Sequence, residues 1–305
     1  MTSAPEIVRN ALESSTTQRE QREGRVDTGR LARFFGALVA LVLGVVAVAY
    51  VADVRLVAIA PLYMFTPAVA AAATVFTTDV SAREVGVRVG RLRWHGLAAV
   101  SVLVLVGAAL ALSIAAPGIA LDPDANPTPG IPLPAGPLGV VALVALTLGL
   151  GATVNAVFAF GEEFGWRGYL LWELAPLGFW RASAVVGVCW GLWHAPIVLD
   201  GYNYPSFPLV GVVAMTAATV AFAPLYTYVV VRARSVLAAA VFHGVFNAAA
   251  GSLLVYTESS DPVRAELVAS PVGLAGIVAF GLATALVAAR GVPALTRRSL
   301  GAVED

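Results

Sequence analysis

Residues 138–160 read LGVVALVALTLGLGATVNAVFAF, and no charged side chain interrupts this run. An α-helix rises about 1.5 Å per residue, so about 20 apolar residues cross the hydrocarbon core of a bilayer. The whole chain of 305 residues has the same character, since 59% of its residues are hydrophobic and only 12% are charged. A soluble fold carries roughly twice that share of charge. The sequence therefore predicts a membrane protein.

Seven further apolar runs are long enough to cross a membrane. Backbone groups in lipid need hydrogen-bond partners within the chain, and the alternation of a barrel strand is missing, so all eight runs are predicted helices. We expect an all-α, polytopic protein with a single helical domain over 31–290, a polar and largely disordered tail over 1–30 and a second tail over 291–305. The seven runs are roughly 31–52, 56–76, 95–116, 182–199, 208–231, 236–256 and 271–290.

Charge placement predicts the orientation. All 19 basic residues are arginines, and with the N-terminus inside only Arg55 and Arg264 fall in outer segments, which leaves 17 inside. Both tails are therefore expected in the cytoplasm, with the protein in the cell membrane. The 19 acidic residues balance the 19 basic ones, which excludes a nucleic-acid binder, and the single cysteine excludes an internal disulfide.

Two adjacent carboxylates follow the quoted run, in Gly161-Glu162-Glu163-Phe164-Gly165-Trp166-Arg167. No turn signal separates them from the run, so the helix is expected to continue. Glu163 and Arg167 are four residues apart and can pair. Glu162 points about 100° away and is expected to have no local partner. The competing interpretation is a solvated helix end at the inner surface.

A histidine lies deep in the fifth predicted span, in Trp190-Gly191-Leu192-Trp193-His194-Ala195-Pro196. His194 is twelve residues into the span, about 18 Å from its start. Pro196 is expected to kink the helix. Gly187 and Gly191 have the spacing that lets another helix approach closely. The competing interpretation is a packing helix with one satisfied histidine.

A third cluster lies in the seventh predicted span, where His243 and Asn247 are four residues apart and share a helix face. An interhelical hydrogen bond would be the structural explanation. Ionisable groups inside a bilayer are costly, so all three clusters are candidate functional residues. Together they supply carboxylates, imidazoles, an amide and a guanidinium, which suffice to activate a water. The His-Glu-x-x-His zinc signature is absent, so a metal site would need ligands from separate helices.

The three clusters, in this order, resemble the CPBP family of intramembrane proteases. That family includes the type 2 CAAX prenyl endopeptidases, the bacterial Abi-type proteins and proteins like lysostaphin resistance protein A. Its pattern is Glu-Glu-x-x-x-Arg, then Phe/Trp-x-x-x-His, then His-x-x-x-Asn/Asp. The chain has Glu162-Glu163-x-x-x-Arg167, Trp190-x-x-x-His194 and His243-x-x-x-Asn247, and the resemblance covers a core of about 138–256.

The resemblance implies a membrane-embedded endopeptidase that hydrolyses a peptide bond near the membrane. Glu162 would be the base that activates water, and His194 would hold that water or a metal. His243 and Asn247 would orient the substrate carbonyl and stabilise the oxyanion.

The resemblance also implies supporting roles for Glu163, Arg167 and Trp190. Glu162, His194 and His243 can bind zinc or another divalent metal with water in the fourth position, and a metal-free glutamate mechanism uses the same residues. The implied partners are membrane lipid and a membrane-associated protein or peptide, with a CAAX-like or lipidated C-terminus as the eukaryotic precedent.

Two other classes of function fit the same residues. A proton- or ion-coupled transporter would use the buried carboxylates and imidazoles as a relay, although the chain shows no internal repeat of the kind common in transporters. A catalytically silent membrane protein, for bacteriocin immunity or anchoring, would function without Glu162. Cleavage of a peptide library, with Glu162→Ala as the blank, separates these classes.

Overall fold

The structure, a computed structural model, describes residues 24–128 and 131–301. Over these residues it has seven helical segments long and apolar enough to cross a membrane, and an eighth, shorter apolar helix at Val236–Gly251. The predicted all-α, polytopic membrane fold is confirmed. The seven segments are Thr28–Val51, Leu56–Phe76, Leu92–Ile114, Pro137–Leu177, Phe179–Leu199, Pro208–Ala233 and Val263–Ala289.

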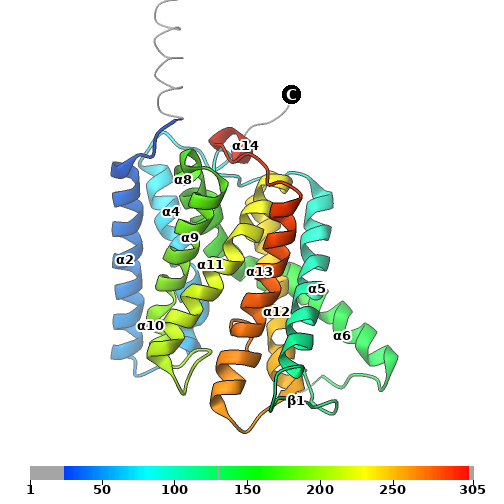
Figure 1. The fold of residues 1–305 in the computed structure, drawn as a ribbon. Helices are drawn as coiled ribbons and strands as arrows, with labels where there is room; N and C mark the ends of the chain where they lie inside the picture. Colours follow the sequence, from blue (N-terminus) through cyan, green and yellow to red (C-terminus); the bar gives the residue numbers. More distant parts are fainter. Residues whose placement is uncertain (1–23, 129–130, 302–305) are drawn as a thin grey trace, which may run out of the picture.

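Most of these segments stand side by side as a bundle (Figure 1). Helix α12 (Val236–Tyr256) packs against α5 (Leu92–Ile114) and against the fourth segment, and α11 (Pro208–Ala233) packs against the fifth segment and α13 (Leu274–Ala289). The first segment, α2 (Thr28–Val51), packs against α4 (Thr66–Phe76), which follows the short α3 (Ala60–Met64). Helices α12 and α4 thus pack closely against the fourth segment, which carries the paired glutamates.

The fourth segment runs without a break from Pro137 to Leu177, so the helix does continue through the paired glutamates as predicted. It consists of α6 (Pro137–Leu150), η2 (Gly151–Asn155), α7 (Ala156–Glu163), η3 (Phe164–Leu170), α8 (Leu171–Leu174) and η4 (Ala175–Leu177). Both η2 and η3 have π-helical hydrogen bonding, which is rare and is often found at functional sites. Helix α6 projects from the bundle, whereas α8 lies within it (Figure 1).

The fifth segment is broken where the sequence predicts a kink. Helix α9 (Phe179–Trp193) ends before His194, and α10 (Ala195–Leu199) begins directly after it. Pro196 occupies the first turn of α10, where a missing amide hydrogen costs nothing. His194 therefore lies at the break, with its amide bonded to the carbonyl of Gly191, three residues back.

The glycines of α9 allow the predicted close approach, and the neighbour is α11. A methyl group on Gly191 would lie 2.5 Å from the Cα of Thr216, and one on Gly187 would lie 2.8 Å from the Cα of Val220. Side chains at these positions would push the two helices apart. The close approach is therefore confirmed, and it fixes α9 in the bundle.

Both described ends of the chain meet at one end of the bundle. Glu173 of α8 is fully buried there and accepts hydrogen bonds from Arg30 Nε at 2.7 Å and from Arg297 Nη2 at 2.6 Å. Arg297 begins α14 (Arg297–Gly301), so part of the segment predicted as a C-terminal tail packs against the bundle. Residues 1–23 and 302–305 of the predicted tails lie outside the described residues.

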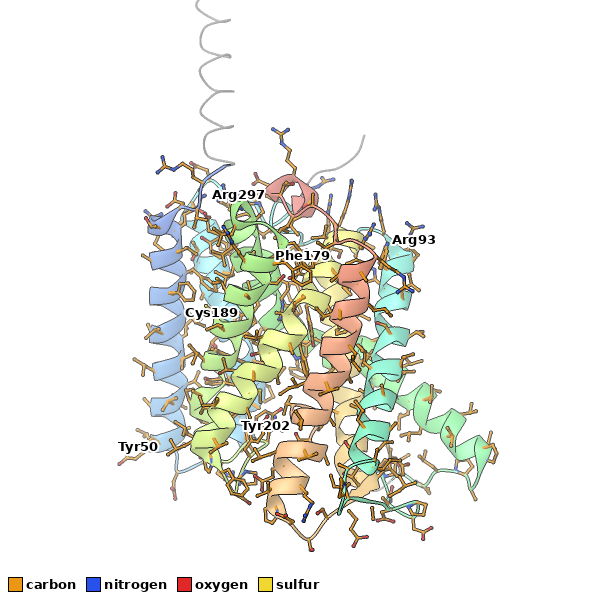
Figure 2. All side chains as sticks on the ribbon, viewed as in Figure 1. Tyr50, Arg93, Phe179, Cys189, Tyr202 and Arg297 are labelled. Carbon is orange, nitrogen blue, oxygen red and sulfur yellow. The ribbon has the colours of Figure 1, made fainter. Side chains whose placement is uncertain are left out.

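The opposite end of the bundle carries the proline-rich connection between α5 and α6. Its many Pro and Gly residues predict an extended linker without a helix, and its described part has no helix. Two of its residues form β1 (Ala120–Leu121), which pairs antiparallel with β2 (Thr257–Glu258). Figure 2 shows Tyr50 and Tyr202 toward this end and Arg93 and Arg297 at the other.

Candidate active site

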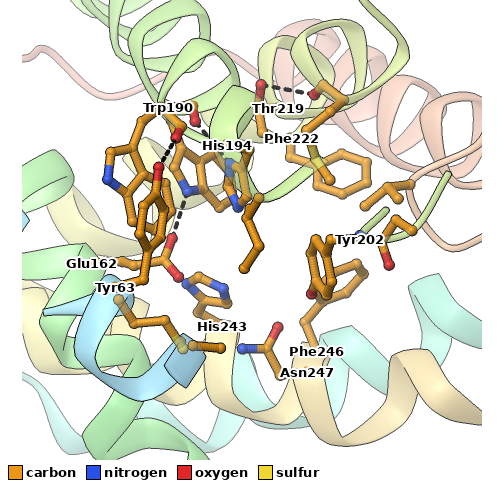
Figure 3. A pocket seen from close by; sticks show the side chains of 17 residues that line it. Tyr63, Glu162, Trp190, His194, Tyr202, Thr219, Phe222, His243, Phe246 and Asn247 are labelled. Atoms are coloured by element: carbon orange, nitrogen blue, oxygen red, sulfur yellow. Dashed lines mark hydrogen bonds between the residues drawn. The ribbon is translucent and has the colours of Figure 1, made fainter. Parts of the chain in front are cut away.

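A cavity of about 100 Å³ lies inside the bundle, and all four residues expected to act on a substrate line it (Figure 3). Glu162 comes from α7, His194 from the break between α9 and α10, and both His243 and Asn247 from α12. The structure therefore brings together side chains that are up to 85 residues apart in the sequence, from Glu162 to Asn247.

Glu162 is only 3% exposed, and the Trp190 indole Nε1–H donates a hydrogen bond of 2.7 Å to its Oε2. The expectation that Glu162 has no local partner holds along its own helix but is wrong for the folded chain, because the donor comes from α9. Oε1 accepts no hydrogen bond from the residues that the structure describes, and Glu162 borders the cavity. One carboxylate oxygen is held and the other is available to a water.

The ring of His194 is oriented by its own helix. Its Nδ1 lies 2.8 Å from the carbonyl oxygen of Trp190, four residues back. A carbonyl oxygen can only accept, so Nδ1 carries the hydrogen and Nε2 of the neutral ring has a free lone pair. The helix break makes this possible, because the amide of His194 bonds to Gly191 instead.

The ring of His243 is oriented by Glu163, the second glutamate of the pair. Nδ1 of His243 lies 2.9 Å from Glu163 Oε1, and Arg167 Nη1 donates to the same oxygen at 3.0 Å. Nδ1 again carries the hydrogen, so Nε2 of His243 faces away from Glu163. The predicted pairing of Glu163 with Arg167 is confirmed, and the pair also supports a histidine.

Arg167 is fully buried, with its guanidinium 4.1 Å from the ring centre of Trp190 and 4.2 Å from that of Tyr226. Glu163 is also fully buried. The interpretation of this stretch as a solvated helix end is therefore wrong. Counting Arg167 among the charges of the inner surface was likewise wrong, because its charge is neutralised inside the bundle.

Asn247 lies one helical turn after His243 and is exposed, with no hydrogen bond to the part of the chain that the structure describes. Its amide is therefore available to a substrate. Figure 3 shows it beside His243, at the edge of the open space.

The cavity lining includes two residues that the sequence did not single out, Tyr202 and Asn203, from the connection between α10 and α11. Figure 3 shows Tyr202 across the open space from His243. They belong to no motif and lie after the predicted span 182–199, so the sequence did not indicate a role for them. The chain turns here with a left-handed backbone at Asn203, where φ is 61°. Burial raises the pKa of the Tyr202 hydroxyl, and the nearby Glu162 adds to this effect. Tyr202 is therefore a neutral hydrogen-bond donor at physiological pH.

The three candidate metal ligands, Glu162, His194 and His243, line the same cavity. Among the residues that the structure describes, however, no group of three or more His, Cys, Asp or Glu side chains has an arrangement that could hold a metal ion.

The stretch that holds the three clusters matches a known protein family. Residues 142–249 match the family described as Type II CAAX prenyl endopeptidase Rce1-like. This range includes the four cavity residues expected to act on a substrate, and also the supporting Glu163, Arg167 and Trp190. No curated protein matches the chain.

Proposed function

We propose that this protein cleaves membrane-associated peptides with a water activated by Glu162. Its residues 142–249 match the Rce1-like type II CAAX prenyl endopeptidases, and the chain is a polytopic membrane protein. The observation that carries the proposal is that Glu162, with one carboxylate oxygen free of hydrogen bonds to the described residues, lines the same cavity as the imidazoles of His194 and His243. Each imidazole has its Nδ1 engaged, so both direct their Nε2 atoms away from their supports.

The reaction begins with the water. Its oxygen attacks the peptide carbonyl carbon while Oε1 of Glu162 takes one of its protons, and Nε2 of His194 accepts a hydrogen bond from the same water. The carbonyl oxygen becomes an oxyanion, to which the Asn247 amide donates. With Glu163 against its Nδ1, His243 can carry a second proton, and its Nε2–H then donates to the oxyanion as well.

Collapse of this intermediate breaks the carbon–nitrogen bond. Glu162 passes the proton it has taken to the leaving amine nitrogen, and the new carboxylic acid loses its remaining proton to solvent. Glu162 is then ionised again, so the cycle needs no further reactant. Removing one positioned acid–base group of this kind typically costs about 10²–10⁴ in rate.

The substrate class is tested with the purified full chain in proteoliposomes. We expect it to cleave peptides that end in cysteine, two aliphatic residues and a variable residue, with prenylated peptides cleaved faster than their unmodified counterparts. Fragments are measured by mass spectrometry, with Glu162→Ala as the blank. Ion flux without cleavage would instead support a transporter, and a function unaffected by Glu162→Ala would support a silent membrane protein.

Metal dependence is tested on the same preparation. Because the side chains of the cavity do not form a three-ligand site, we expect the protein to keep its cleavage rate after dialysis against a chelator. The rate and the bound zinc are measured together before and after dialysis. Loss of cleavage that returns on addition of zinc would contradict this prediction and assign the cavity side chains to a metal.

The orientation is tested with reporters. The end of the bundle with Arg93, Arg297 and α14 is proposed to face the cytoplasm, because the arginines gather in the segments expected there. A reporter that is active only outside the membrane is therefore expected to stay inactive after Asp305 and to be active after Asp124. Activity after Asp305 would reverse or disrupt the eight-span topology.

A further inference from the structure

The indole of Trp190, from α9, borders the cavity next to Glu162. Trp190 is 4% exposed, and its Nε1–H donates to Oε2 of Glu162 at 2.7 Å. A hydrogen bond from a neutral donor to a carboxylate is shorter and stronger than one between two neutral groups. This distance is in the range of such charge-assisted bonds.

No other side chain performs this task for Glu162 in the part of the chain that the structure describes. The guanidinium of Arg167 and the imidazole of His243 both direct their hydrogen bonds to Glu163. Both groups therefore bind the carboxylate of Glu163, and the orientation of Glu162 depends on the indole of Trp190.

Trp190 is itself fixed by aromatic and cationic neighbours. The guanidinium of Arg167 lies 4.1 Å from its ring centre, and the rings of Tyr226 and His243 lie at 5.3 and 5.5 Å. The backbone carbonyl of Trp190 also accepts the Nδ1–H of His194. One residue thus holds two of the groups that face the water.

We propose that Trp190 is a positioning residue, whose indole N–H holds Oε2 of Glu162 so that Oε1 faces the reacting water. The inference rests on the proposed function and deepens it. The family pattern accepts phenylalanine at this position, which fills the same space but has no donor. In this chain the indole therefore adds a hydrogen bond that the pattern alone does not require.

The kinetic test is Trp190→Phe in the full-length protein. A hydrogen bond to a charged group corresponds to about a tenfold to hundredfold change in rate, so kcat is expected to fall by that factor. KM is expected to stay within about twofold, because phenylalanine keeps an aromatic ring where Trp190 borders the cavity. A Trp190→Phe protein with the kcat of the parent would overturn the inference.

The matched control is Trp166→Phe. Trp166 is also fully buried and its indole nitrogen has no hydrogen-bond partner among the described residues, but it does not line the cavity. This variant removes the same atoms without removing a hydrogen bond, so its kcat is expected to stay within about twofold of the parent. An equal fall in both variants would assign the effect to lost packing and overturn the inference.

A spectroscopic measurement tests the hydrogen bond without reference to activity. The six tryptophans give six indole N–H resonances in the ¹⁵N-labelled protein. The one from Trp190 is expected downfield of the others and is expected to move upfield in Glu162→Gln. If it does not move, the inference fails even where the parent cleaves peptides. If it moves but the parent cleaves nothing, the proposed function fails and the bond stands.

Discussion

Glu162→Gln is expected to lower kcat by at least about a hundredfold, because the amide cannot take a proton from water. Gln has the same shape as Glu, and its carbonyl oxygen can still accept the indole hydrogen of Trp190. The folded structure should therefore survive. Cleavage rate and the thermal unfolding midpoint in detergent are measured for the variant and the parent, and only the rate should change.

The same variant has a clear opposite outcome. If Glu162→Gln turns over a substrate as fast as the parent, Glu162 is not the base. Glu163 then becomes the next candidate, although it is fully buried and does not line the cavity.

Glu163→Gln is expected to damage the fold as well as the activity. It leaves the charge of Arg167 unpaired in a site where both side chains are fully buried. Breaking a buried ion pair from one side typically costs about 3–5 kcal/mol. The unfolding midpoint of this variant should therefore fall well below those of the parent and of Glu162→Gln.

The matched control for this prediction removes both charges. Glu163→Gln combined with Arg167→Met leaves no unpaired charge, and methionine retains much of the contact with the rings of Trp190 and Tyr226. The double variant should unfold at a higher temperature than Glu163→Gln alone. Additive losses would mean that the pair contributes nothing as a pair.

The sequence predicted best those features that depend on a single helix. Hydropathy depends on length and composition, and the eight predicted spans match seven long helical segments and one shorter helix. The break just before Pro196 and the pairing of Glu163 with Arg167 follow from local geometry within one helical segment. Both were correct for that reason.

Contacts between helices could not be predicted in the same way. Nothing near Glu162 in the sequence indicates that the indole of Trp190 donates to it, since 28 residues separate them. The same holds for His243 and Glu163, which are 80 residues apart. Such partners depend on how the helices pack, and the motif spacing indicates only that the groups belong to one site.

The N- and C-terminal segments show the same limit. Arg30 and Arg297 lie in segments that composition assigns to polar tails, yet both bind the buried Glu173. Their charge is what identified them as tail residues, and only the packed structure shows that the charge is compensated inside the protein.

The position of Glu173 at the end of the bundle also sets the minimum length of extended peptide that a substrate needs to reach Glu162. Eleven residues separate Glu173 from Glu162 on one continuous helix, which corresponds to about 16 Å along its axis. An extended peptide covers about 3.3 Å per residue. A substrate that enters from the end of the bundle with α14 therefore needs about five extended residues between its folded domain and the bond to be cut. A substrate with a shorter extended segment cannot bring that bond to Glu162.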